Sequence, residues 1–278
     1  MNCKKVLTIL GIICLIAIVV FVLVYSHESY IKNTYINPYS LTVYESPFPK
    51  IRMGNDGDGG YIIADIPLFQ YDYLLGCGVS DDISFEVDFL SRYPEVKSCL
   101  FDGTVDSLPE KHPNITFVKK NIGPKETENE TNLSKYFELY NNMFLKMDIE
   151  GGEYPWFEIL TENQIDKFEQ IVLEFHEPNS KQHQSVFDKI NKTHYLIHIH
   201  GNNNLNEPDY HQGIKAPKVF ECTYLNKKYF RAKPKLNKDK LPITNLDKSN
   251  SPGTIDIDLS YPPFTNSSED VIKENGCQ

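Results

Sequence analysis

The sequence predicts an α/β fold, in which helices cover both faces of a mostly parallel sheet and one transmembrane helix precedes it. Between residues 46 and 231, apolar segments of strand length alternate with segments of helical periodicity, a pattern typical of parallel sheets. Several of the apolar segments end abruptly in glycine, aspartate or histidine. Open α/β sheets bind their ligands at the carboxyl ends of such strands.

A long apolar run extends from Val6 to Tyr25 and carries no charged residue. At ~1.5 Å per residue, a helix of this length reaches roughly 30 Å, enough to cross a bilayer. Lys4 and Lys5 precede the run, and such a basic flank stays in the cytosol. We therefore expect a cytosolic tail over residues 1–5, a transmembrane signal anchor over 6–25 and a stalk over 26–45.

This orientation predicts a single-pass type II membrane protein of the secretory pathway, in the Golgi or ER, with a lumenal domain. A cleaved signal peptide is the alternative, but Ser26 to Tyr30 is a poor cleavage site. Triplets that accept N-linked glycans agree with a lumenal domain. They begin at Asn114, Asn129, Asn132, Asn191 and Asn266.

The composition limits which binding partners, metal sites and disulfides we expect. Asp and Glu number 38 against 28 Lys and Arg, which argues against a nucleic-acid partner. No cysteine–histidine spacing indicates a zinc site. The cysteines beyond the predicted span allow up to two disulfides in an oxidising compartment; they are Cys77, Cys99, Cys222 and Cys277.

The first half of the domain, which we expect over residues 46–231, opens with a glycine-rich loop from Arg52 to Gly60. Aromatic and leucine residues three to four positions apart predict helices over Ile83–Arg92 and Asn132–Asn141. Apolar segments bounded by turn residues predict strands at Tyr61–Ala64, Tyr71–Leu75, Val96–Phe101 and Ile115–Val118.

The second half repeats this alternation. Apolar runs closed by a polar residue predict strands at Met143–Met147, Ile171–Phe175 and Tyr195–Ile199, and a terminal strand pair at Val219–Leu225 and Tyr229–Phe230. Helices are expected between them at Trp156–Leu160, Asn163–Phe168 and Gln182–Asn191. Lys, Pro, Asn and Ser dominate after Arg231, so residues 232–278 are expected to form an extended, weakly packed tail.

Three strand ends carry residues suited to chemistry. The strand that includes Phe144–Met147 runs into the acidic segment Asp148–Glu153, and carboxylates at such a position cost desolvation energy unless they bind or catalyse something. Gly76 and Gly78 close an earlier strand, where glycine lets a ligand approach the backbone and the next helix start offers free N–H groups. Asp102 ends the following strand, where an acid accepts hydrogen bonds from ribose hydroxyls in nucleotide-type sites. An aspartate cap on a turn is the structural alternative.

Together these segments resemble the FkbM-like group of S-adenosylmethionine-dependent methyltransferases. The resemblance rests on Gly76-Cys77-Gly78, on Asp102 and on Lys146–Glu153, its most specific part. A related methyltransferase-like branch opens with Arg-x-Gly-x-x-x-Asp-Gly-Gly-Tyr, which Arg52–Tyr61 matches, and Ser84-Phe85-Glu86 also matches that branch. The resemblance runs from about residue 45 to 230. It implies a Rossmann-like, seven-stranded class I methyltransferase fold with S-adenosylmethionine as cofactor.

The resemblance also implies roles for single residues. Gly76, Gly78 and Glu86 would belong to the cofactor site, Asp102 would hold the ribose, and Asp148 would lie between cofactor and acceptor.

Methyl transfer further requires an aligned acceptor and a base. His176 and His200 each end a strand at the same sheet edge, and the unperturbed histidine pKa of about 6.5 suits a base. An ordinary hydrogen-bonded structural role is the alternative for each.

The acidic segment also has the oxygen ligands that Mg²⁺ or Ca²⁺ prefers, in Asp148, Glu150 and Glu153 with Asn202 at the same edge. Charge compensation at a helix start explains Glu150 and Glu153 as well. We therefore predict no metal site, and a functional role for Asp148 alone among the three.

These observations predict an anchored O-methyltransferase of the secretory pathway that acts on a glycan or another small-molecule acceptor. Two accounts compete with it. A Golgi-type glycosyltransferase with a nucleotide-sugar donor would use an Asp-x-Asp metal clamp, and Asp56-Gly57-Asp58 and Asp256-Ile257-Asp258 fit that pattern. A non-catalytic lumenal binding protein that retains the fold is the other, because fold does not establish function.

Overall fold

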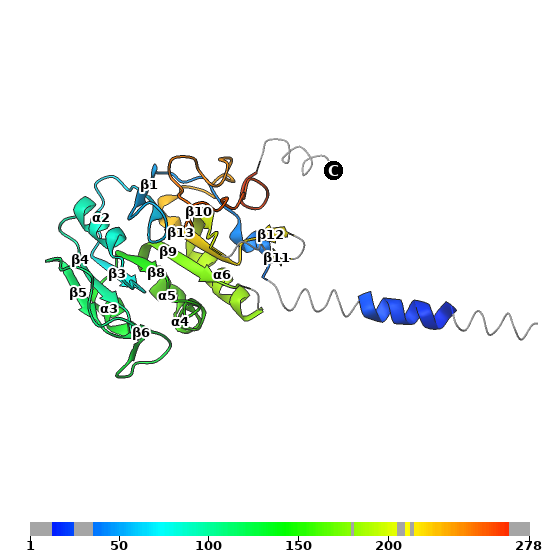
Figure 1. Cartoon of the computed structure of the whole chain (residues 1–278), viewed down its shortest axis with the longest axis horizontal. Coiled ribbons are helices and arrows are strands. Elements are labelled where there is room, and N and C mark those ends of the chain that lie inside the picture. Colours follow the sequence, from blue (N-terminus) through cyan, green and yellow to red (C-terminus); the bar gives the residue numbers. More distant parts are fainter. Residues whose placement is uncertain (1–12, 25–35, 179–180, 205–208, 212–213, 267–278) are drawn as a thin grey trace, which may run out of the picture.

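The computed structural model describes residues 13–24, 36–178, 181–204, 209–211 and 214–266. Residues 13–24 form a helix that lies apart from the folded domain (Figure 1). All of its residues are exposed. The remainder of the predicted transmembrane span, residues 6–12 and Tyr25, lies outside the described residues. Within the described part of the chain, no helix has the length and apolar character needed to cross a membrane.

A seven-stranded sheet forms the centre of the domain (Figure 1), in the order β10-β13-β9-β8-β3-β4-β5. Its strands are β3 (Tyr73–Cys77), β4 (Lys97–Phe101), β5 (Ile115–Val118), β8 (Met143–Met147), β9 (Phe168–His176), β10 (His194–Gly201) and β13 (Val219–Asn226). The α/β class is confirmed. The sheet is mixed, however, because β13 runs antiparallel to both β9 and β10, so the prediction of a mostly parallel sheet is wrong.

The course of the chain after β10 explains the antiparallel strand. Beyond Gly201 the chain passes through the small hairpin of β11 (Asp209–His211) and β12 (Ile214–Ala216). It re-enters the sheet at the edge where β10 ends, since Gly201 lies opposite Phe220. A strand that returns from that edge must run antiparallel, whereas a parallel strand needs a crossover to the far edge. The predicted partner strand at Tyr229–Phe230 is not formed, because Tyr229 ends a short 3₁₀ helix, η2 (Lys227–Tyr229), and Phe230 caps it.

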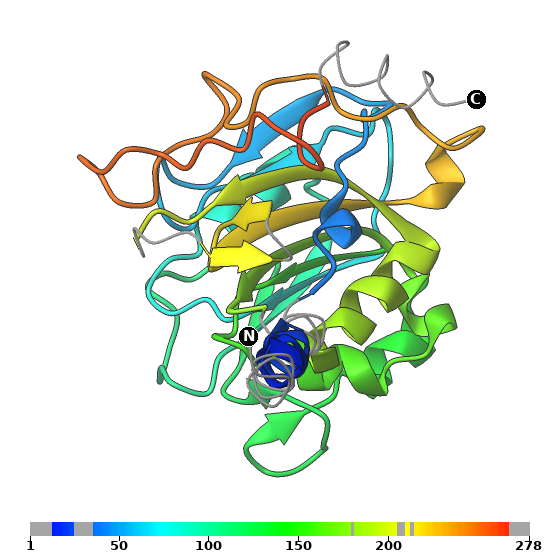
Figure 2. The same cartoon turned by 90° about the vertical axis from the view of Figure 1, so that its right-hand side faces the viewer.

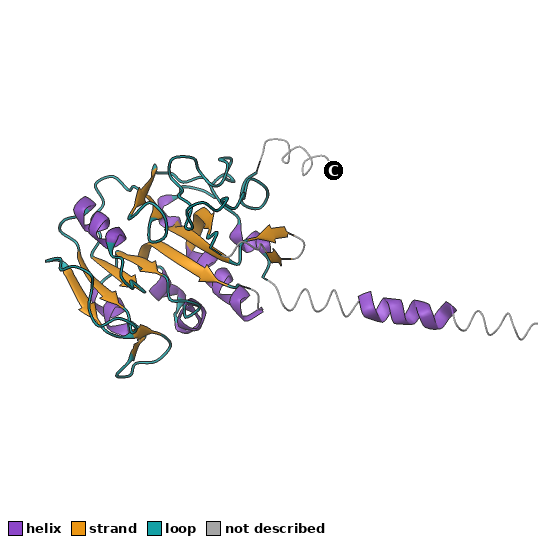
Figure 3. Ribbon diagram, viewed as in Figure 1, coloured by secondary structure: helices purple, strands orange, loops and turns teal. Residues whose placement is uncertain are grey.

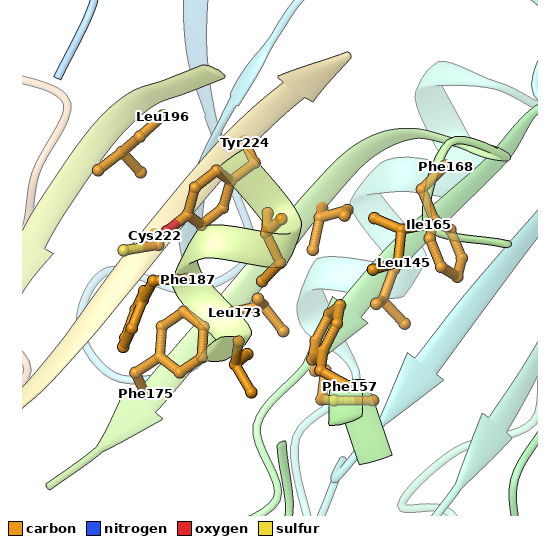
Figure 4. Close-up of a cluster of buried hydrophobic side chains, with 14 of the residues drawn as sticks. Leu145, Phe157, Ile165, Phe168, Leu173, Phe175, Phe187, Leu196, Cys222 and Tyr224 are labelled. Atoms are coloured by element: carbon orange, nitrogen blue, oxygen red, sulfur yellow. The ribbon is translucent and has the colours of Figure 1, made fainter. Parts of the chain in front are cut away.

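Both faces of the sheet are covered, and alternate residues of each strand point to opposite faces. Leu75, Leu145 and Leu173 join the core that contains α3 (Ser134–Leu139), α4 (Glu153–Ile159) and α6 (Lys181–Thr193). Figure 4 shows part of this core, where Phe175 and Phe187 lie close to Cys222 and Tyr224. The neighbouring residues Leu74, Phe144 and Val172 face the other side. There they pack with α2 (Ser84–Arg92), β1 (Lys50–Met53) and β2 (Tyr61–Ala64).

Smaller elements complete the domain. They are η1 (Pro38–Leu41), β6 (Asn121–Ile122), β7 (Glu130–Thr131) and α5 (Glu162–Ile165). A capping box fixes the start of α5, with Thr161 and Gln164 satisfying each other's backbone N–H groups.

The C-terminal segment, residues 232–266, is irregular but closely packed, which corrects the expectation of a weakly packed tail. Figure 3 shows it almost entirely as loop, yet Leu241, Leu259 and Phe264 are buried in the main core. In Figure 2 this segment (orange to red) lies beside the N-terminal part of the domain (blue), where Tyr44 pairs with Leu236. Residues 267–278 lie outside the described residues.

The predicted stalk is also part of the folded unit from Ile36 onward. Ile36, Leu41 and Val43 are fully buried in the main core, and the Val43 N–H donates to the carbonyl of Pro263. Residues 25–35 lie outside the described residues. The folded unit therefore extends on both sides of the predicted 46–231 domain.

The cysteines and the asparagines of the glycan-acceptor triplets differ in their exposure and in their contacts. Cys77, Cys99 and Cys222 are buried free thiols, and Cys277 lies outside the described residues. The side-chain amides of Asn114 and Asn191 donate to backbone carbonyls, whereas Asn129 is exposed.

Candidate active site

A cavity of about 610 Å³ opens where three neighbouring strands of the sheet end. Gly78 follows β3, Asp102 follows β4 and Asp148 follows β8, and all three residues line the cavity. Because β8, β3 and β4 are adjacent and parallel, their carboxyl ends meet at one edge. The structure thus brings together the glycine turn and both aspartates.

Gly78 is required by the close approach of two backbones. Its φ is +73°, and a Cβ placed there would lie 1.6 Å from the carbonyl oxygen of Asp148. The Gly78 N–H donates to the carbonyl of Phe101. The turn after β3 is therefore held tightly between the ends of β8 and β4, and Gly78 itself lines the cavity.

Asp102 lines the cavity and also caps the turn. One carboxylate oxygen accepts the N–H groups of Val79 and Ser80 at 3.1 and 2.9 Å, and the other accepts the N–H and hydroxyl of Thr104. Burial opposes the charge, but these hydrogen bonds outweigh it and lower the pKa of Asp102. The structure thus shows the capping role that the sequence offered as the alternative for Asp102, and the ribose role stays a prediction.

Asp148 lies in a half-buried position between polar groups. The hydroxyl of Tyr61 donates to its Oδ2 at 3.3 Å. Lys146 donates to the Gly78 carbonyl at 2.8 Å and lies over the Tyr61 ring. Burial raises the pKa of Asp148, with Lys146 opposing the shift and Glu153 adding to it. A carboxylate with a raised pKa is a stronger base than an ordinary aspartate.

Gly76 and Glu86 lie beneath the cavity and do not line it. A Cβ on Gly76 would lie 2.9 Å from Glu86 Oε1 and 2.5 Å from a methyl carbon of Leu100, so Gly76 makes room for these side chains. Glu86 is fully buried, its oxygens have no hydrogen-bond partner within the described structure, and burial raises its pKa. The structure does not bring Gly76 and Glu86 to the proposed cofactor surface.

His176 ends β9 and lies behind Asp148, outside the cavity lining. Its Nε2 is 3.2 Å from Glu150 Oε2, 3.5 Å from Glu174 Oε1 and 4.0 Å from Asp148 Oδ1. Burial acts to lower the pKa of His176, but the surrounding carboxylates, Glu153 foremost, raise it. His176 is therefore close to Asp148 without direct access to the cavity.

His200 is engaged elsewhere. It is 1% exposed, its Nδ1 is 3.4 Å from Glu221 Oε2, and its Nε2 is 3.0 Å from Asp256 Oδ1. Burial opposes the charge, but Asp256 and Glu221 raise the pKa of His200 to about 10. A buried imidazolium with both nitrogens occupied cannot accept a proton, so the structure contradicts His200 as the base.

Comparison with known proteins agrees with this geometry. A family model described as the methyltransferase FkbM domain matches residues 46–202, more than half of the chain. The chain belongs to the FkbM methyltransferase family. No curated protein sequence matches it. The FkbM match ends just after β10, so β13 and the C-terminal segment lie beyond it although they pack into the same unit.

The two Asp-x-Asp patterns do not form clamps in this FkbM protein. Asp56 pairs with Lys248 at 3.5 Å, while Asp58 lines the cavity. Asp256 binds His200. Asp258 accepts the N–H of Ser260. In each pattern the two carboxylates have different partners.

Sequence reasoning missed three polar residues beside the FkbM cavity, Glu174, Glu221 and Asn250. Glu174 accepts a hydrogen bond from Asn202 at 3.0 Å. Asn250 donates to Glu221 at 2.7 Å and to Asp58 at 3.2 Å. Charged residues inside apolar strands, such as Glu174 and Glu221, were a signal that could have found them. Asn250 gave no such signal because it lies in a segment of ordinary surface composition.

Proposed function

We propose that this protein is an S-adenosylmethionine-dependent O-methyltransferase whose cofactor binds in the cavity at the ends of β3, β4 and β8. The observation that carries the proposal is the convergence of Gly78, Asp102 and Asp148 on that cavity. Membership of the FkbM methyltransferase family supports it.

The residues around the cavity suit this cofactor. The volume lies within the roughly 300–1,000 Å³ of small-molecule sites. Phe101 and Ile122 offer apolar surface for a flat ring, and Asp102 lies beside them for hydroxyl groups. The Gly78 turn offers bare backbone.

When bound, the cofactor supplies an electrophilic methyl group on sulfur. The chain must hold an acceptor hydroxyl in line with that group and take up the hydroxyl proton. Asp148 suits the second task, because its carboxylate lines the cavity and burial raises its pKa. Tyr61 donates to the same carboxylate and fixes its orientation.

We extend the proposal to a glycan or other small acceptor in the secretory pathway, and to a membrane anchor. The helix over residues 13–24 exposes apolar side chains on all sides, which suits an apolar environment around it. The exposed acceptor triplet at Asn129 suits a lumenal domain. Kinship within the FkbM-like group suggests the glycan.

Calorimetry of the full chain with S-adenosylmethionine tests the cofactor. We expect saturable binding, and we expect Asp102→Ala to weaken it by about 1–3 kcal/mol through loss of buried hydrogen bonds. Asp106→Ala is the matched control, because Asp106 lies on the same loop but is 92% exposed and pairs only with Lys119 among the described residues.

Absence of binding to the folded, full chain would overturn the enzyme assignment and favour a binding protein that retains the fold. Equal affinity of the Asp102 and Asp106 variants would reject the role given to Asp102.

A further inference from the structure

A cluster of potential metal ligands lies against the cavity, at the ends of β8 and β9. One ligand atom each from Asp148, Glu174 and His176 lies within 4.8 Å of the other two. Glu150 Oε2 lies 3.2 Å from His176 Nε2. Glu174 and His176 belong to β9, whereas Asp148 and Glu150 lie in the loop that follows β8, its parallel neighbour. The backbone of Asp148 is held in place because its N–H donates to the carbonyl of Cys77 at the end of β3.

Buried oxygen atoms in this cluster have no hydrogen-bond partner. Asp148 Oδ1 and Glu174 Oε2 are both inaccessible, and neither makes a hydrogen bond within the described structure. The Glu174 side chain is 4% exposed. Unpaired buried carboxylate oxygens cost several kcal/mol in general, and a bound cation removes that cost.

We propose that Asp148, Glu174 and His176 bind a single divalent cation of the Mn²⁺ or Mg²⁺ class. Two carboxylates and one imidazole form a set of hard oxygen ligands with one nitrogen, which suits Mn²⁺ and its neighbours. Ca²⁺ prefers six to eight oxygen ligands, and the imidazole disfavours it. Asn202 orients the ligand Glu174 by donating to its Oε1.

A second carboxylate group nearby is a weaker candidate. Asp58, Glu174 and Glu221 also lie within reach of one another. However, the Asn250 amide already donates to Asp58 and Glu221. These hydrogen bonds satisfy one oxygen of each carboxylate, and His200 pairs with the other oxygen of Glu221, so we place the cation at the group that contains His176.

The position of the metal site suggests how the cation takes part in methyl transfer, an inference that rests on the proposed function. Asp148 belongs both to the cluster and to the cavity wall. A cation there can take the acceptor oxygen as a further ligand, which lowers the pKa of the acceptor hydroxyl. Asp148 can then take up the hydroxyl proton although the bound cation lowers the pKa of Asp148 as well. The cation would thus bind the acceptor through oxygen and favour acceptors that carry hydroxyl groups.

Mn²⁺ binding to the full chain, freed of metal by a chelator, tests the site without any activity assay. We expect calorimetry and electron paramagnetic resonance to report one Mn²⁺ per chain, bound more tightly than Ca²⁺. Glu174→Gln should weaken Mn²⁺ binding more than about 100-fold, and Asn202→Ala about 10- to 100-fold, as loss of an outer contact does.

Glu169→Gln is the matched control. Glu169 is another fully buried glutamate on β9, at the opposite end of the strand, where it binds Lys228 and Tyr229. Its substitution should leave Mn²⁺ affinity unchanged. Unfolding temperatures give a second readout: Glu174→Gln should stabilise the metal-free protein, because it removes one of several like charges, and should abolish the rise that Mn²⁺ gives the wild type.

Absence of stoichiometric Mn²⁺ binding, tighter binding of Ca²⁺, or equal Mn²⁺ affinity in Glu174→Gln and Glu169→Gln would each overturn the metal site. Calorimetry with S-adenosylmethionine separates the two proposals. Cofactor binding without Mn²⁺ binding rejects the metal site alone, and Mn²⁺ binding without cofactor binding rejects methyl transfer alone.

Discussion

Gly78 and Gly151 occupy similar backbone conformations in very different surroundings. Their φ angles are +73° and +94°, both in the region that favours glycine. A Cβ on Gly78 would collide with the backbone of Asp148, whereas a Cβ on Gly151 would meet nothing within 4 Å. Alanine substitutions at the two glycines therefore separate two losses of stability. One comes from the strained backbone conformation, and the other from steric crowding at the strand ends.

We expect Gly151→Ala to lower the free energy of unfolding by about 1–2 kcal/mol, the cost of a left-handed alanine. Gly78→Ala should cost a further 1–3 kcal/mol or so, because the carbonyl of Asp148 must move. Urea denaturation followed by circular dichroism measures both. Equal losses in the two variants would show that the turn after β3 can open to admit a methyl group.

The element scale shows what the sequence could and could not predict. The strand that ends at Asp148 was predictable because its apolar run stops abruptly at charged residues. The direction of β13 was not, because an apolar strand has the same pattern in either direction. The C-terminal segment was missed for another reason: Leu241, Leu259 and Phe264 stand singly among polar residues, and no periodicity marks irregular chain that is nonetheless buried.

Because the C-terminal segment is buried, we expect a large loss of stability when one of its apolar side chains is replaced by alanine. Phe264→Ala should lower the free energy of unfolding by about 3–5 kcal/mol, since it empties a fully buried site. Ile255→Ala, in the same segment but 92% exposed, should change it by less than about 0.5 kcal/mol. Chemical denaturation measures both variants. Comparable small losses would mean that the segment detaches before the domain unfolds.

At the scale of the whole molecule, polar contacts between distant parts of the chain surround the candidate site. His200 on β10 binds Glu221 on β13 and Asp256 in the C-terminal segment. Asn250 joins the same segment to the acidic residues beside the cavity. The candidate site residues at the strand ends were predictable because they follow apolar runs. The contacts of His200 and Asn250 were not predictable, since they depend on how segments far apart in the sequence meet.

The His200 contacts predict a pH dependence of stability. The folded protein raises the pKa of His200 to about 10, above the unfolded value of about 6.5. The stabilisation from its charge is therefore complete below about pH 6.5 and is lost as the pH rises toward 10. His200→Gln should cost roughly 3 kcal/mol at pH 6 and progressively less at higher pH.

Denaturation of wild type and His200→Gln at several pH values measures this trend. His112→Gln is the control, because His112 lies near the surface and binds only the Asn114 N–H among the described residues. The same pH trend in both variants would contradict its assignment to His200. A His200→Gln deficit that grows with rising pH would contradict the assignment of charge.

The position of β13 between β9 and β10 governs how this protein can be made on the ribosome. Strand β9 lacks its neighbour on one side until residues 219–226 have been synthesised. The backbone groups of Val43 find their partners later still, when Asn237 and Pro263 have been synthesised. The nascent chain therefore exposes an open sheet edge between the synthesis of β9 and that of β13, and native assembly is postponed until Pro263 has emerged.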